Sequence, residues 1–169
     1  MKKIIAVSDS HGNRDLLRNA LSQAAQGSPI DLCVHCGDGV RDMDSLADTI
    51  TQASPHARVY TARGNCDLAS FDVPTLTLFE ANGVPMMVTH GHLFGVKHEL
   101  ESLLCVAEAR KAKVVFFGHT HHPFLETVRG ITLINPGAIC AQMPGNIAYA
   151  QVLVDAGGKV RADLMKWLD

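Results

Sequence analysis

Short polar motifs with the residue types of metal ligands follow five apolar stretches of this 169-residue sequence. In chain order they read SDSHG, CGD, GNCD, THGH and GHTHH. A single histidine in such a motif would more often be a packed or solvent-exposed residue. Five motifs at the ends of successive apolar stretches favour another interpretation, because side chains beyond the carboxyl ends of parallel strands meet at one edge of a sheet. We therefore expect the motifs to converge on one site.

Spacing within the motifs would aim pairs of side chains at one point. Residues two apart in an extended segment point the same way, as Asp9 and His11 would. The CGD and GNCD motifs add one carboxylate and one amide oxygen. The full set of candidate metal ligands is Asp9, His11, Asp38, Asn65, His90, His119 and His121.

The chemistry of this set points to a metal centre that acts on phosphorus. Carboxylate, imidazole and amide groups without a thiolate are unlike a structural zinc site and favour manganese, with nickel, zinc or iron as alternatives. Seven ligands exceed the need of one ion. Two divalent ions that share Asp38 could lie about 3.5 to 4 Å apart, the separation used for in-line displacement at phosphorus. The predicted substrate is a small phosphate ester.

The stretches that carry the first three motifs alternate with helical patterns. Residues 3–7, 32–36 and 58–62 are short apolar runs typical of buried strands. Asn13 can cap a helix after the first run, and apolar residues from Met43 to Ile50 recur at helical spacing after the second. This order predicts parallel strands with helices packed outside them.

The pattern changes in the second part of the chain. Asn82-Gly83 separates strand-like runs at 75–80 and 85–89 and indicates a hairpin. An amphipathic helix is predicted from Val96 to Ala107, followed by a buried strand at 114–117. Further strands are predicted at 124–128, 132–134, 148–154 and 159–165. The sequence thus predicts one mixed α/β domain over residues 1–169, with two sheets.

Charge and cysteine content narrow the class of protein. A formal net charge of -2 and a pI near 6.5 argue against specific nucleic-acid binding. No apolar run has the length of a signal peptide core or a membrane span. Five cysteines form an odd number without a regular framework, which is typical of reduced thiols and predicts a cytoplasmic protein. A homo-oligomer is neither indicated nor excluded.

Together, DxH, GD, GN, HGH and GHTH in this order resemble the motifs of calcineurin-like metallophosphoesterases. SDSHGN, GNCD, THGHLFG and the later NPG are most similar to the YfcE-like phosphodiesterases of that family. The resemblance implies a four-layer αββα sandwich of two mixed β-sheets flanked by helices. It also implies a dinuclear phosphodiesterase in which a hydroxide between the metals attacks phosphorus in line.

The resemblance further divides the candidate ligands between the two ions. One ion would be held by Asp9, His11, Asp38 and His121, and the other by Asp38, Asn65, His90 and His119. Asp38 would then be the bridging ligand. The amide of Asn65 could also donate a hydrogen bond to the phosphate.

Cys66 is a departure from the wider family. Many relatives carry a histidine at this position, which can give a proton to the leaving oxygen, followed by an acidic residue that orients it. Here the pair is Cys66 and Asp67, and a thiol is a weaker hydrogen-bond donor than an imidazolium. His92 is the second candidate for this proton transfer. The candidate catalytic residues are therefore Asn65, Cys66 and His92.

Other readings of the cysteines and serines are weaker. Cys33 and Cys36 form a CxxC, but residues three apart in a strand face opposite sides and cannot bind one ion. Ser8 and Ser10 lie beside an aspartate and a histidine, yet the sequence has no GxSxG elbow. Cys66 as a nucleophile would need a phosphate-cradling loop with an arginine, which GNCD does not provide unless Arg63 contributes.

Three histidines outside the ligand set have no predicted role in metal binding. His35, His56 and His98 are expected to lie away from strand ends, in packing or in solvent. Two alternative functions stay open, a phosphomonoesterase and a non-catalytic, metal-stabilised interaction scaffold, because the family includes the small retromer subunit, which works through protein contacts. The presence of all seven ligand residues favours an enzyme.

Overall fold

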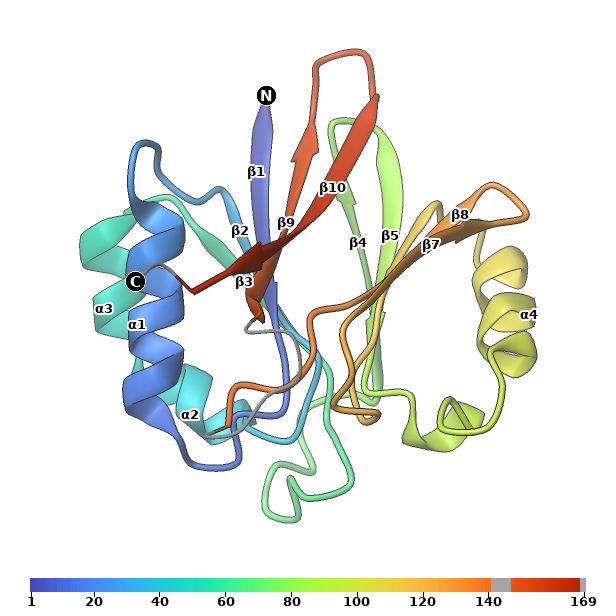
Figure 1. Cartoon of the computed structure of the whole chain (residues 1–169), viewed down its shortest axis with the longest axis horizontal. Helices are drawn as coiled ribbons and strands as arrows, with labels where there is room; N and C mark the ends of the chain where they lie inside the picture. Colours follow the sequence, from blue (N-terminus) through green and yellow to red (C-terminus); the bar gives the residue numbers. More distant parts are fainter. Residues whose placement is uncertain (141–146, 168–169) are drawn as a thin grey trace.

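The computed structural model describes residues 1–140 and 147–167. Two five-stranded sheets pack face to face, with helices on their outer faces (Figure 1). The elements follow in the order β1 (Lys2–Val7), α1 (Arg14–Ala25), β2 (Leu32–His35), α2 (Val40–Ser45), α3 (Ala47–Ala53), β3 (Arg58–Thr61), β4 (Leu76–Ala81), β5 (Val84–Thr89), η1 (His92–Phe94), α4 (Glu101–Ala109), β6 (Val114–Phe116), β7 (Phe124–Val128), β8 (Ile131–Asn135), β9 (Ile147–Val154) and β10 (Val160–Lys166). The predicted four-layer αββα sandwich is confirmed.

Both sheets are mixed. The first has the order β10-β9-β1-β2-β3, in which β1, β2 and β3 are parallel and β9 and β10 pair antiparallel. The second has the order β4-β5-β6-β8-β7, in which β5, β6 and β8 are parallel and the edge strands are antiparallel. Helices α1, α2 and α3 cover the first sheet and α4 covers the second (Figure 1).

Alternation of side chains along the strands divides the core into three layers. Ile4 packs between the two sheets, whereas its neighbour Ile5 packs against the helices of the first sheet. Met87 and Leu103 belong to the third cluster, between the second sheet and α4. Successive residues of a strand point to opposite faces, so continuous apolar runs are what strands buried on both faces require.

The two cysteines of CVHC obey the same rule. Cys33 lies in the cluster beneath the helices and Cys36 lies between the sheets. Burial raises the pKa of Cys33 to about 12 and raises that of Cys36 well above its ordinary value. These buried thiols face opposite ways, as the strand spacing predicts, so they cannot share a metal ion.

Two predicted helices have different bounds in the structure. The apolar pattern from Met43 to Ile50 is divided between α2 and α3, with Leu46 outside both helices. The helix predicted to begin at Val96 begins only at Glu101, because the chain turns after Gly95, whose φ of 65° is left-handed. In the described part of the chain, no helix is both long and apolar enough to cross a membrane.

Candidate metal centre

The five polar motifs lie together at one end of the sandwich (Figure 1). Asp9, Asp38 and Asn65 follow β1, β2 and β3 of the first sheet. His90 follows β5 of the second sheet, and His119 comes after β6. Because both sheets present the carboxyl ends of parallel strands here, the site spans the boundary between them.

The backbone of the candidate ligands is strained. Five of them have a left-handed φ without being glycine: Asp9 at 52°, His11 at 46°, Asp38 at 56°, His119 at 66° and His121 at 60°. This conformation costs roughly 1–2 kcal/mol for a residue with a Cβ. Glycine is required beside Asp38, since a Cβ at Gly64 would overlap with Asp38 Oδ1. Such clustered strain is typical of sites whose geometry serves a function rather than stability.

One half of the centre is formed by Asp9, His11 and His121. His121 Nε2 lies 3.1 Å from Asp9 Oδ1, and His11 Nε2 lies 3.7 Å from the same oxygen. The two imidazole Nε2 atoms are 3.3 Å apart. Asp9 is fully buried while His11 is exposed, so the half-site has a buried carboxylate and an open side.

The other half is formed by Asp38, Asn65 and His90. His90 Nε2 lies 3.4 Å from Asp38 Oδ2 and 3.1 Å from Asn65 Oδ1. His90 is fully buried, and its Nδ1 is 2.8 Å from the carbonyl oxygen of Cys36, which fixes the ring so that Nε2 faces the centre. Asp38 Oδ2 is also 3.9 Å from His11 Nε2, so its carboxylate lies between the two halves.

His119 and His92 lie on the His90 side of the centre. The ring centroid of His119 is 5.0 Å from that of His90, and the ring centroid of His92 is 5.3 Å from that of His90. The backbone N–H of His119 donates to Asp9 Oδ2 at 3.1 Å. All seven predicted ligands therefore come together, and His92 lies beside them, although their roles stay predictions.

Metal ions fit this arrangement on two observations. Asp9 Oδ1 is buried and has no hydrogen-bond partner among the described residues, although three histidine Nε2 atoms lie within 4.0 Å of it. An unsatisfied buried carboxylate oxygen is costly unless a cation compensates it. In addition, Asp9, His11 and His121 place one ligand atom each within 4.8 Å of one another, as do Asp9, Asp38 and His90.

Burial and paired charges set the protonation of the centre. Burial acts to raise the pKa of Asp38, but hydrogen bonds from His90 and Cys66 outweigh it and hold the pKa well below its ordinary value. Burial acts to lower the pKa of His90, whereas Asp38 and Asp9 raise it overall. Burial lowers the pKa of His119 to about 4, with a contribution from the charge of His90. The Asp38 carboxylate is ionised and His119 is neutral at pH 7, the forms that bind metal ions.

Cys66 lies beside His11 and Asp38 of the centre. Its Sγ is within 4.8 Å of ligand atoms of His11 and Asp38, and it accepts a hydrogen bond from Asn65 Nδ2 at 3.3 Å. Its interaction with the Asp38 carboxylate raises the pKa of the thiol to about 11. Cys66 is therefore a neutral, exposed thiol at pH 7 and has little nucleophilic character.

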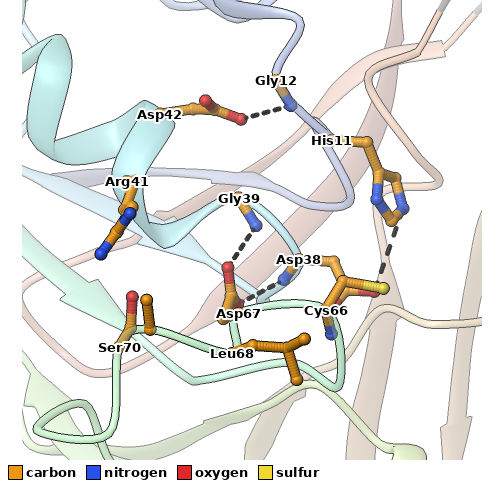
Figure 2. A pocket seen from close by; sticks show the side chains of 11 residues that line it. His11, Gly12, Asp38, Gly39, Arg41, Asp42, Cys66, Asp67, Leu68 and Ser70 are labelled. Atoms are coloured by element: carbon orange, nitrogen blue, oxygen red, sulfur yellow. Dashed lines mark hydrogen bonds and ion pairs between the residues drawn. The ribbon is translucent and has the colours of Figure 1, made fainter.

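Asp67 has a positional role that the sequence did not reveal. Its two carboxylate oxygens accept hydrogen bonds from the backbone N–H groups of Asp38 at 2.7 Å and Gly39 at 2.9 Å (Figure 2). They also accept the backbone N–H groups of Val40 at 3.1 Å and Gly64 at 2.8 Å. Asp67 therefore connects the loop after β3 to the loop that carries Asp38.

A second supporting network corrects the expectation for His35. This histidine ends β2 and is fully buried, rather than lying away from strand ends. Its Nδ1 accepts the backbone N–H of Gly37 at 3.1 Å, and its Nε2 lies 3.5 Å from Ser10 Oγ. Ser10 in turn donates to Asp42 at 2.6 Å, and Asp42 also accepts the N–H of Gly12 at 2.8 Å. The network holds the residues on both sides of His11, while His56 and His98 are exposed as expected.

Comparison with known proteins matches this chain to phosphoesterases. Residues 1–157 match the calcineurin-like phosphoesterase superfamily domain. The chain is 36% identical over 136 residues to the probable metallophosphoesterase YsnB of Bacillus subtilis, a match that covers 80% of this chain and 74% of that protein. It is 28% identical over 166 residues to the phosphodiesterase YfcE of Escherichia coli K12, covering 88% of this chain and 85% of that protein.

Solved structures share the fold at lower identity. A structure titled as a novel archaeal phosphodiesterase aligns with a TM-score of 0.73 at 21% identity, covering 96% of this chain and 99% of that chain. A D62A mutant of Vps29 from Entamoeba histolytica aligns with a TM-score of 0.69 at 13% identity, covering 98% of this chain and 99% of that chain. These identities show a common fold and carry no function. The matched domain and the relatives establish that the chain belongs to the calcineurin-like phosphoesterase superfamily.

Proposed function

We propose that this protein is a dinuclear metal-dependent phosphodiesterase acting on small phosphate esters. The observation that carries the proposal is the position of Asp38, whose Oδ2 lies 3.4 Å from His90 Nε2 and 3.9 Å from His11 Nε2. A carboxylate between two ligand groups is suited to two ions, and YfcE is named as a phosphodiesterase. The metal ligands would be the seven residues named above, with manganese the first metal to test.

Two divalent cations in this centre would lower the pKa of a water molecule and stabilise the charge that develops on the phosphoryl oxygens. The chain's own residues would position the ester. Asn65 has Oδ1 near His90 Nε2 and Nδ2 near Cys66, so its amide nitrogen is on the exposed side. There it can donate to a phosphoryl oxygen, which would orient phosphorus for in-line displacement.

The proton for the departing alkoxide would come from Cys66 or from His92. Cys66 is protonated at pH 7 because its pKa is about 11. Burial and the charge of His90 lower the pKa of His92, so the imidazole is a weaker proton source than an exposed histidine. This pairing supports Cys66 as the first candidate. Neither group is a strong general acid, and general acid catalysis is worth roughly 10² to 10⁴ in rate. We therefore expect the protein to prefer esters whose alcohol leaves easily.

The five cysteines support the proposed cytoplasmic location. Cys33 and Cys36 are buried free thiols, and Cys66 and Cys105 are exposed free thiols. Accessible free thiols persist in reducing compartments.

The test compares Asp38→Asn with Asp163→Asn after removal of metal and reconstitution with Mn²⁺. Asp163 is on β10 and pairs only with Arg161 among the described residues, so it is a matched control. We expect the wild type and the control to hydrolyse bis(p-nitrophenyl) phosphate faster than p-nitrophenyl phosphate. Asp38→Asn should lose at least 100-fold in kcat/KM and one of two bound ions by calorimetric titration.

The outcomes separate the alternatives. Hydrolysis of the monoester alone would make the protein a phosphomonoesterase. Stoichiometric binding of two Mn²⁺ ions with no turnover of either ester would favour the metal-stabilised scaffold. Binding of a single ion by the wild type would contradict the dinuclear centre.

A further inference from the structure

A cavity of about 400 Å³ opens beside the metal centre, between α2 and the loop after β3 (Figure 2). His11 and Asp38 of the centre form part of its wall, together with Cys66. Its volume is within the range of small-molecule sites. A substituent of a bound phosphoester would therefore extend from the metal centre directly into this cavity.

The acidic side chains in the cavity wall are already committed elsewhere. Asp67 accepts four backbone N–H groups, as described above. Asp42 accepts hydrogen bonds from the Ser10 hydroxyl, from the backbone N–H of Gly12 and, at 3.3 Å, from Arg14 Nε. Asp38 belongs to the metal centre. The oxygens of Asp42 and Asp67 are therefore hydrogen-bonded within their own loops, and neither carboxylate forms an ion pair with Arg41.

Arg41, unlike these aspartates, has a side chain that is available to a ligand. It is exposed in the first turn of α2, and its side chain forms no hydrogen bond or ion pair with any described residue, although three aspartates also line the cavity. Figure 2 shows Arg41 reaching from α2 toward Ser70, on the facing loop. A guanidinium group opposite a hydroxyl presents several donors to one tetrahedral oxyanion.

The remaining wall is apolar and accessible. Leu68 is 74% exposed and lies beside Ala69 in the cavity lining. An exposed leucine beside a polar pocket adds contact area for an organic group that inorganic phosphate would not use. The cavity thus combines an apolar wall, a free cation and an open connection to the metal centre.

From these features we infer that the cavity binds the non-leaving substituent of a phosphodiester, and that Arg41 pairs with a second oxyanion group on that substituent. The inference rests on the proposed function and narrows its substrates to diesters that carry an additional negative charge. Arg41 would be a specificity-determining residue, since it lies outside the set of metal ligands.

The test uses two substrates that differ by one phosphate. They are thymidine 5'-(p-nitrophenyl phosphate) and the same ester with a phosphate on its 3'-hydroxyl. With the Mn²⁺-loaded protein, we expect kcat/KM for the 3'-phosphorylated ester to be the higher of the two. Arg41→Gln should reduce the ratio of the two kcat/KM values about tenfold, as expected for loss of a partly exposed charge-assisted hydrogen bond. Arg161→Gln, an exposed arginine on β10, should leave the ratio unchanged.

A binding experiment keeps the inference separate from the proposed function. Calorimetric titration would compare thymidine 3',5'-bisphosphate with thymidine 5'-monophosphate on the same variants. The tighter binding of the bisphosphate should depend on Arg41 and not on Arg161. Equal binding of both nucleotides by the wild type, or a preference that survives Arg41→Gln, would overturn the inference. Failure to hydrolyse any ester would sink the proposed function alone, because the binding comparison would still decide what the cavity takes.

Discussion

The carboxylate of Asp67 accepts the backbone N–H of Asp38 at 2.7 Å, so one aspartate positions another across two loops. The same carboxylate accepts three further backbone N–H groups. Asp38 has a left-handed φ of 56°, a conformation that needs external support in a non-glycine residue. The geometry of the proposed bridging ligand therefore depends on a residue that need not contact a metal ion.

Asp67→Asn should destabilise the protein by about 2–4 kcal/mol, because the new NH₂ group faces backbone donors and leaves some of them unsatisfied. Affinity for Mn²⁺ should fall as well, since the support of Asp38 is weakened. Urea denaturation of metal-free protein and calorimetric metal titration measure the two effects. Asp72→Asn, an exposed change in the same loop, is the control and should alter neither. Wild-type metal affinity in Asp67→Asn would argue against a role of Asp67 in positioning Asp38.

Substitution of Lys3 by methionine should destabilise the protein more than the same substitution of Lys2. Lys3 is 9% exposed, and its Nζ donates to the carbonyl of Ala24 at 2.5 Å and to Ser28 O at 3.0 Å, which joins β1 to the end of α1. Lys2 forms a 2.8 Å ion pair with Asp31 at the surface. Lys3→Met should cost about 1–3 kcal/mol in the free energy of unfolding, because the buried carbonyl of Ala24 and the partly buried carbonyl of Ser28 lose their donor. Lys2→Met should cost under about 1 kcal/mol. Equal decreases in the free energy of unfolding for the two variants would show that the hydrogen bonds of Lys3 do not contribute to stability.

His35 should make stability depend on pH in the acidic range. Burial lowers its pKa from 6.5 to about 4. Between these values the unfolded chain binds a proton that the folded protein excludes, so stability is complete above pH 6.5 and is lost as the pH falls toward 4. The contribution amounts to about 1.4 kcal/mol per pH unit for one proton.

Comparison of the wild type with His35→Asn isolates this contribution, because the asparagine oxygen can still accept the N–H of Gly37. Denaturation from pH 7 to pH 4 in the presence of a chelator should give a shallower loss of stability for the variant. His56→Gln changes an exposed histidine and should follow the wild type. Parallel curves for wild type and His35→Asn would mean that folded His35 binds its proton as readily as His35 of the unfolded chain, so that burial does not lower its pKa.

Cys66 is expected to limit turnover of esters with poor leaving groups. Cys66→His would place an imidazole beside Asn65 and Asp38. It should raise kcat/KM about 10- to 100-fold for dialkyl phosphates, which have no nitrophenyl leaving group. Bis(p-nitrophenyl) phosphate should gain much less, since nitrophenolate departs without a proton. The second variant, Cys66→Ala, should retain hydrolysis of aryl esters. Near-total loss of aryl ester hydrolysis in Cys66→Ala, with both metal ions still bound, would make the thiol a direct participant in the reaction.

The strands and the ligand motifs could be predicted because each depends on local sequence. Continuous apolar runs indicated buried strands, and Asn82-Gly83 forms a turn in which both residues have positive φ, at 48° and 78°. The ends of helices were harder. Met43 and Ile50 keep one helical spacing across the break between α2 and α3, so apolar periodicity does not register the turn at Leu46.

The supporting residues could not be predicted in the same way. Asp67 contacts backbone groups 27 to 29 residues away at Asp38, Gly39 and Val40, and backbone N–H groups leave no mark in a sequence. His35 lies within an apolar run, where sequence alone does not distinguish a hydrogen-bonded histidine from a packed one. Asp42 did leave a signal, because it is a buried acidic residue between the buried Val40 and Met43 of α2. An acidic side chain on an apolar helix face calls for a polar partner, which here is Ser10.

Strand order also constrains how the chain is made. β1 is the first strand synthesised, yet it lies between β2 and β9, and β9 ends only at Val154. All seven candidate ligands have been translated by His121, and 33 residues separate this last ligand from the end of β9 at Val154. At roughly 5–20 residues per second this takes about 2–7 s. During that interval a nascent chain carries a full set of ligands while one edge of β1 is still unpaired, and an unpaired edge is where neighbouring chains on a polysome would associate.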